Sequence, residues 1–193
     1  MGLDIFRKTL ESKRDIESKI IVGLLASVEA DRLGLSVDKE KLRRMIRMLS
    51  SLGLYQRFEL PFLEDSNRFF ELEGQQLAVQ HDPAIFLQHV EKRLNEAGEM
   101  IQRYLQHITK PSLIKSIEKY LLDPHCNQLV ERGLESLVEG DRIADLKRMF
   151  ILFQRISNTP MIKVAWSDYI KRYKHYHPFL ISSLSSSSSS LPL

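Results

Sequence analysis

Hydrophobic side chains recur every three to four residues along most of this chain, which is the spacing of one face of an α-helix. One such run covers residues 16–28 and another covers residues 42–52. Each is followed by a glycine that can end a helix, Gly34 or Gly53. Ser36 is placed to cap the second helix. No segment alternates apolar and polar positions between turn residues, so the pattern predicts no β-sheet.

Two longer helices are predicted in the middle of the sequence. The first runs roughly from Glu59 to Gln80, with Pro61 in its first turn, where the missing N–H is tolerated. Asp82 caps the second, and Pro83 takes its first position. The second helix has a heptad-like seam about 26 residues long, formed by Leu87, Val90, Leu94, Ala97, Ile101, Tyr104 and Ile108.

Four shorter helices are predicted after Pro111. We expect Pro124 to close the first, Gly140 the second and the turn at residues 157–160 the third. The last helix carries Ile162, Trp166 and Ile170 on one face. The whole pattern predicts an all-α fold, built as an elongated stack of antiparallel helices.

Composition narrows the class of protein. The net charge of +3 is small, and the basic residues near the C-terminus are less dense than in a typical nucleic-acid-binding stripe, so a nucleic-acid partner is not expected. A single cysteine, Cys126, excludes an internal disulfide and indicates a reducing compartment, the cytoplasm or nucleus. No apolar run approaches the ~18 residues of a membrane span, so no membrane partner is expected.

The sequence offers no catalytic, cofactor-binding or metal-binding residues. It contains no phosphate-binding glycine loop, nucleophile elbow or zinc-protease motif, so we expect no enzyme and no cofactor. His125 and Cys126 lack further ligands at zinc spacing, and we interpret them as a helix-start histidine beside a buried cysteine. His175 and His177 are interpreted as a solvated helix end.

Three other groups of residues have simple structural interpretations. We expect most of the carboxylates on the first long helix to be solvated, namely Glu59, Glu64, Asp65, Glu71 and Glu73. Lys39, Arg43 and Arg47 form a basic stripe. We do not expect it to bind phosphate, because the nearby carboxylates of Asp38 and Glu40 reduce its positive charge. We expect the aromatic residues of the last helix to be core, namely Trp166, Tyr169 and Tyr173.

The stretch from Leu54 to Leu105 resembles the second helical repeat of a cullin, the elongated scaffold of a class of ubiquitin ligases. The resembling residues are Phe58, Glu59, Phe62, Leu63, Ser66, Asn67, Arg68, Phe70, Glu73, Gly74, Gln75, Val90, Lys92, Arg93, Leu94, Tyr104 and Leu105. Tyr55 departs from the family pattern, because it stands one residue closer to Phe58 than in cullins. On a continuous helix that would rotate Tyr55 by about 100°, which leaves the start of this helix open.

The resemblance extends over roughly residues 2–173 and is closest to the cullin-four branch, which pairs with a damaged-DNA-binding adaptor. It implies a five-helix repeat at residues 1–110 and a partial second repeat at residues 111–176. Residues 177–193, rich in serine, are expected to be a disordered tail. With Met1, this tail suggests a sequence that begins and stops in the middle of a larger scaffold.

The function that the resemblance implies is that of a non-catalytic scaffold segment in a cullin-RING ubiquitin ligase. In cullins the adaptor docks on the first repeat, and the RING partner binds a C-terminal region. Neither part is matched here, so no functional residue is carried over. The alternative is a stand-alone helical interaction module, such as a subunit of a vesicle-tethering complex. Apolar faces at the two ends of the chain predict self-association. The residues of these faces are Ile5, Phe6, Leu10, Ile162, Trp166, Ile170 and Tyr173.

Overall fold

The computed structural model describes residues 2–176, with side chains from Asp4 to Arg172, and this part of the chain is all-α without a strand. Every helix predicted from the sequence has a counterpart. The elements in chain order are α1 (Gly2–Ser12), α2 (Arg14–Arg32), α3 (Lys39–Ser51), α4 (Tyr55–Gln80), α5 (Pro83–Arg103), the 3₁₀ turn η1 (His107–Thr109), α6 (Lys110–Ser116), the π-helical turn η2 (Ile117–Leu122), the 3₁₀ turn η3 (Asp123–His125), α7 (Cys126–Glu139), α8 (Ile143–Arg155) and α9 (Thr159–Tyr176).

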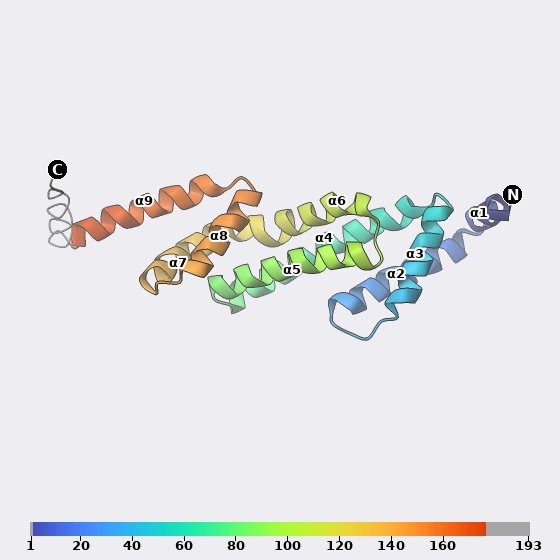
Figure 1. The fold of residues 1–193 in the computed structure, drawn as a ribbon, viewed down its shortest axis with the longest axis horizontal. Helices are drawn as coiled ribbons and strands as arrows, with labels where there is room; N and C mark the ends of the chain where they lie inside the picture. The colour runs from blue at the N-terminus through green and yellow to red at the C-terminus, as the bar shows by residue number, and fades with distance from the viewer. Residues whose placement is uncertain (1, 177–193) are drawn as a thin grey trace, which may run out of the picture.

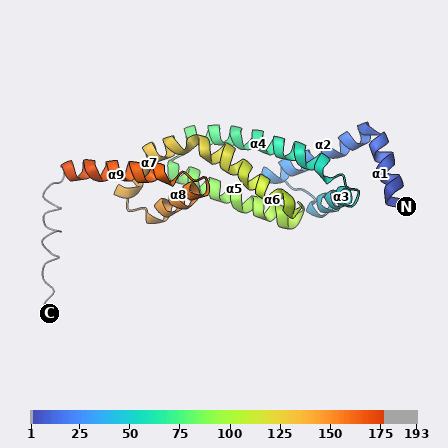
Figure 2. The same cartoon turned by 90° about the horizontal axis from the view of Figure 1, so that it is seen from above.

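The helices form a rod, which confirms the predicted elongated stack (Figure 1). Helices α4, α5 and α6 run back and forth along the long axis, with α1, α2 and α3 at one end and α7, α8 and α9 toward the other. The view from above shows the same order and places α1 and α9 at opposite ends (Figure 2). The molecule therefore presents two distant ends joined by a packed middle.

The middle of the rod holds the most completely buried side chains. Phe58 and Phe62 of α4 are 0% exposed, and so are Leu87 of α5 and Leu121 of η2. The rings of Phe58 and Phe62 stack with their centroids 5.6 Å apart. Because α4, α5, α6 and η2 contact one another along their length, the apolar stripes of all four close into one core.

Two helix starts differ from the prediction. Asp38, and not Ser36, caps α3, because its Oδ1 accepts the Lys41 backbone N–H at 2.9 Å. Helix α4 begins at Tyr55 rather than Glu59, so Pro61 lies inside the helix rather than in its first turn. Gly53 has a φ of 68° and lies in the tight turn after α3, so α4 starts two residues later. Its N-cap residue, Leu54, makes no side-chain hydrogen bond, so the sequence carries no capping signal for this start.

Two helix ends also differ. The predicted seam is shorter, because α5 ends at Arg103 and Ile108 lies 69% exposed in the following turn. The chain leaves the helix at Tyr104, whose ring is buried. Pro124 does not close a helix either. It lies at the start of the short 3₁₀ turn η3, where its missing backbone N–H would have no helical hydrogen-bond partner. Helix α7 follows η3 without a loop.

The proposed division at residues 110 and 111 stays a prediction. Helix α6 begins at Lys110 and packs against both α4 and α5, so the two predicted units share a core. The predicted disordered tail, residues 177–193, lies outside the described residues.

Candidate functional site

The histidine and the cysteine considered as metal ligands do not form a metal site in the part of the chain that the structure describes. Within residues 2–176, no group of three or more His, Cys, Asp or Glu side chains is arranged to hold a metal ion. His125 packs its ring edge-on against Phe86, with centroids 5.5 Å apart, and burial lowers its pKa. Cys126 is buried, and burial raises the pKa of its thiol to about 12, so the reactive thiolate is scarce at neutral pH. His175 and His177 lie outside the described side chains.

The carboxylates of α4 divide into two kinds. Glu64 and Glu71 are exposed, as expected. Two carboxylates are exceptions to the expected solvated face. Glu73 accepts hydrogen bonds from Arg93 of α5, and Glu59 accepts one from Thr109 at 2.5 Å. Their partners are 20 and 50 residues away in sequence, so a helical periodicity cannot identify them.

The basic stripe of α3 is partly neutralised by neighbouring carboxylates. Lys39 Nζ lies 2.7 Å from Asp31 of α2, and Arg43 lies 3.6 Å from Glu40. Arg47 is exposed. Two of the three cations are thus engaged, which disfavours a phosphate-binding face.

The prediction of a core position is wrong for Trp166 of α9, while Tyr169 is half-buried. Trp166 is 39% exposed and Ile170 is 38% exposed, while Ile162 is half-buried against the core. Among the described elements α9 packs mainly on α7 and α8, and its other side faces solvent (Figure 1). The side chain of Tyr173 lies outside those described.

The most elaborate polar cluster is a joint between α2, α4 and α5, centred on Arg32. This side chain is only 4% exposed and lies over the rings of Phe62, Phe69 and Phe70, at 5.1, 5.4 and 5.6 Å. One of its Nη atoms donates to Ser66 of α4. Burial lowers the pKa of the guanidinium, and the aromatic faces compensate part of the lost hydration.

Arg93 of α5 completes this joint. Its guanidinium donates to both oxygens of Glu73, to Glu96 and to the backbone carbonyl of Arg32. Burial alone would raise the pKa of Glu73, but hydrogen bonds from His89 and Arg93 outweigh it and hold that pKa below its usual value. The arrangement binds three helices together, and each carboxylate oxygen faces a donor rather than an open pocket.

A second joint links α3, α4 and η1 through Tyr55. Its hydroxyl lies 2.6 Å from the hydroxyl of Thr109, which in turn donates to Glu59. The backbone N–H of Gln106 donates to the Tyr55 oxygen. The side-chain amide of Gln106 donates to the Ser50 hydroxyl of α3 at 2.5 Å. Tyr55 is therefore the first residue of α4 and faces inward with Phe58, which resolves the helix start that the sequence left open.

A third joint holds α8 against α5. The carboxylate of Asp145 accepts hydrogen bonds from Gln88 of α5 at 3.2 Å and from Arg142 at 2.9 Å. Arg148 donates to Asp145 and also reaches Glu91 of α5 at 2.7 Å. All three joints include charged groups, and the Thr109 hydroxyl that donates to Glu59 in the second joint is fully buried.

Exposed apolar side chains occur along the whole rod, for example Leu72 and Val79 of α4, and both ends carry some of them. At the N-terminal end these are Ile5, Phe6, Ile16, Val22, Leu33 and Leu35, each at least 46% exposed. Leu10, predicted to lie on the same open face, is instead 5% exposed and belongs to the core. At this end a groove of about 670 Å³ also separates α2 from α3. None of the described helices is long and apolar enough to cross a membrane.

A rod of antiparallel helices joined by polar and ionic contacts is the architecture of an α-solenoid. Residues 1–178 match the family model of the cullin α-solenoid domain, and the chain belongs to the cullin family. This match favours the scaffold hypothesis over the tethering-complex alternative.

Similar proteins include two cullin-four relatives. The chain is 39% identical to cullin-4A of Homo sapiens over 175 residues, which are 90% of this chain and 23% of the human protein. It is 33% identical to cullin-4 of Dictyostelium discoideum over 172 residues, 89% of this chain and 21% of that protein. Cullin-3A of Arabidopsis thaliana is 32% identical over 164 residues, 82% and 22% of the two chains. The chain thus spans less than a quarter of the length of these relatives.

Proposed function

We propose that this chain is a stiff, non-catalytic spacer that contributes to the assembly of a cullin-RING ubiquitin ligase in the cytoplasm or nucleus. The observation that carries the proposal is the set of three polar joints along one rod. They tie α2 to α4 and α5, α3 to α4 by way of Gln106, and α8 to α5. Packed interiors deform little, so a rod joined in this way holds its two ends at a fixed distance.

The test replaces the matching segment of human cullin-4A with this chain and measures ubiquitin transfer by the reconstituted ligase. We expect the chimera to retain most of the transfer rate, because the rod preserves distance and orientation. The control carries a Gly/Ser linker of equal length, which behaves as a flexible coil and should lose most of the rate. Equal rates for chimera and linker would show that stiffness is not the function.

A second test concerns the chain alone. It carries no matched adaptor-binding or RING-binding region, so the purified chain should neither stimulate ubiquitin transfer nor retain a RING protein in a pull-down. Recovery of a RING protein with residues 1–180 would contradict the spacer proposal, because it would place a ligase-partner surface inside the rod.

Weak self-association through the ends is part of the same proposal. Helices α1 and α9 lie at opposite ends of the rod (Figure 2), and both carry exposed apolar side chains. A head-to-tail contact between such ends does not have to close into a ring. We expect the mass measured by light scattering to rise with protein concentration above 22.5 kDa. Added salt should strengthen the association, because α9 and the N-terminal end both carry exposed basic residues. A constant monomer mass at all concentrations would contradict it.

A further inference from the structure

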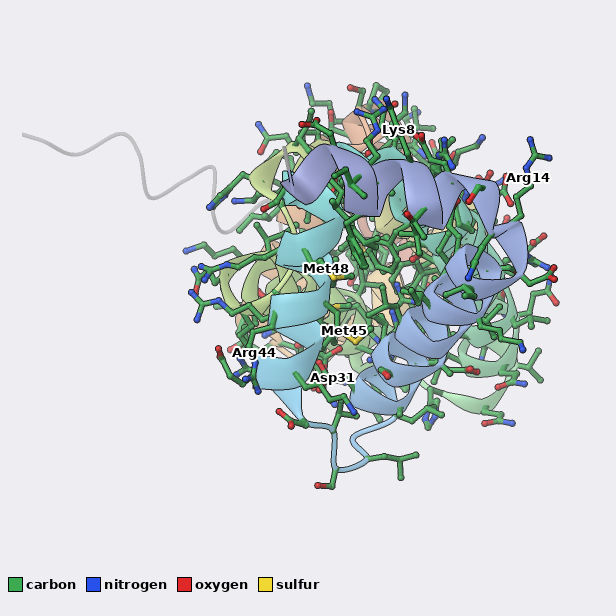
Figure 3. All side chains as sticks on the ribbon, turned by 90° about the vertical axis from the view of Figure 1, so that its right-hand side faces the viewer. Lys8, Arg14, Asp31, Arg44, Met45 and Met48 are labelled. Carbon is green, nitrogen blue, oxygen red and sulfur yellow. The ribbon has the colours of Figure 1, made fainter. Side chains whose placement is uncertain are left out.

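The groove between α2 and α3 has the shape of a site for a helix. Figure 3 looks onto the N-terminal end of the rod, where α2 and α3 diverge below α1 and the side chains of Met45 and Met48 lie between them. Leu24 and Leu42 are 2% and 3% exposed and form its apolar floor. The groove lies apart from the three polar joints, and the spacer function makes no use of it.

The wall that α2 contributes is built from small side chains. Gly23, Ala26, Ser27 and Ala30 all line the groove, and a Cβ added at Gly23 would meet no atom within 4 Å. Small residues let the backbone of another helix approach closely. The lining on α2 extends from Lys19 to Ala30, about 16 Å at 1.5 Å per residue, which is the length of a helix of three turns.

The charge at the rim is basic. Lys19 lies at one end of the lining on α2, and Lys41 lies beside the α2–α3 loop at the other end. In the part of the chain that the structure describes, neither lysine has a carboxylate partner. The one carboxylate in the lining, Asp38, already accepts the backbone N–H of Lys41 as the cap of α3.

We propose that this groove binds an amphipathic helix of a protein partner, about three turns long, with an aliphatic face and an acidic residue near each end. The aliphatic face packs on Leu24, Leu42 and Met45, and the acidic residues pair with Lys19 and Lys41. This is the helix-in-groove mode of recognition. It makes the rod a docking surface as well as a spacer, and it does not depend on ligase assembly.

The charges disfavour a second copy of this chain as the occupant. Helix α9, which carries exposed apolar side chains at the far end of the rod, has Lys163, Lys171 and Arg172 against Asp168 alone in its described side chains. Docking α9 in the groove would bring these cations toward Lys19 and Lys41, and like charges across an interface are unfavourable.

The test uses two fluorescein-labelled synthetic peptides of about 14 residues with leucine and alanine on one helical face. One has glutamates in its first and last turns, and the other has lysines there. Fluorescence anisotropy with the whole chain at low salt should show the glutamate peptide binding about tenfold more tightly, with the preference fading at about 0.5 M salt. The double variant Lys19→Glu/Lys41→Glu should reverse the preference.

A matched pair of variants separates the groove from general effects. Gly23→Leu fills the groove and should weaken binding of the glutamate peptide about tenfold or more. Gly98→Leu on α5 is the control, since a Cβ there also meets no atom within 4 Å and lies outside the groove. Leucine favours helix over glycine, so both variants should fold, which circular dichroism checks.

Three outcomes would overturn the proposal. Equal binding of the two peptides at low salt would remove the role of the lysines. Unchanged binding by Gly23→Leu would place the peptide elsewhere. Dimers of the chain that Gly23→Leu abolishes and Gly98→Leu does not would make a second copy the occupant.

Discussion

Helices α2 and α4 carry apolar stripes of the same periodicity but differ in how much of each stripe is buried. On α4, Phe58 and Phe62 are fully buried. On α2 the stripe is buried at Leu24, which is 2% exposed, but Ile16 in the same stripe is 46% exposed. The difference lies in their neighbours. Helix α4 contacts α2, α3, α5, α6 and η2, while α2 contacts only α1 and α4 to a comparable extent. An apolar stripe therefore predicts a helix, but the elements around it decide which of its residues form core.

The largest effect should come from emptying the core of the middle. Phe62→Ala removes a ring that is 0% exposed and that also lies under Arg32, so we expect the free energy of unfolding to fall by about 3–5 kcal/mol. Urea unfolding followed by circular dichroism measures it. Phe6→Ala, at a ring that is 46% exposed, is the control and should change stability by no more than about 0.5 kcal/mol. Similar losses at both sites would mean that the N-terminal end is as tightly packed as the middle.

The next effect concerns the joint of α2, α4 and α5. Glu73→Gln leaves the guanidinium of Arg93 without its main anionic partner, and we expect a loss of about 2–3 kcal/mol at neutral pH, somewhat below the cost for fully buried pairs. The exposed neighbour on the same helix offers a control, because Glu64→Gln should change little. Thermal melts of both variants beside the unmodified chain measure the difference.

The same variant tests a pH dependence. The pKa of Glu73 is lowered from 4.5 in the folded chain, so its contribution to stability is present above pH 4.5 and is lost as the pH falls through the folded pKa. The stability difference between the unmodified chain and Glu73→Gln should therefore shrink as the pH falls below about 4.5. A difference that grows on acidification would contradict the assigned direction.

The smallest effects should have opposite signs at two helical glycines. At Gly133 an added Cβ would lie 2.7 Å from Pro83 Cβ, so Gly133→Ala should destabilise by about 1–3 kcal/mol. At Gly23 the same methyl enters open space, and Gly23→Ala should stabilise by about 0.5–1 kcal/mol through helix propensity. The melting temperatures of the two variants, compared with that of the unmodified chain, test this prediction. Shifts of the same sign in both variants would contradict the proposed difference in packing at the two glycines.

The sequence predicted the helices well because periodicity, glycines and capping residues are local signals. Asp82 with Pro83, Gly34 and Gly53 were all identified, and the structure confirms each. The polar joints could not be predicted in the same way. Tyr104 and Asp31 are 73 residues apart, yet the Tyr104 hydroxyl donates to the Asp31 carboxylate at 3.0 Å.

The residues that carry the resemblance to cullins have a physical role that the pattern alone did not reveal. Ser66, Phe70, Glu73 and Arg93 all belong to the joint around Arg32. Trp166 shows the reverse case, since its spacing resembles a core position while its ring is exposed. The groove was not foreseen either, because it depends on the angle between α2 and α3.

The uninterrupted helical path from His107 to Glu139 has a geometric consequence. It crosses the boundary predicted at residues 110 and 111 without a loop, so swivelling there would break backbone hydrogen bonds instead of turning a hinge. Proteins bound at the two ends would then be held at a set azimuth about the rod axis as well as at a set separation. Inserting a single residue within this path would turn everything beyond it by about 100° while lengthening the rod by only about 1.5 Å.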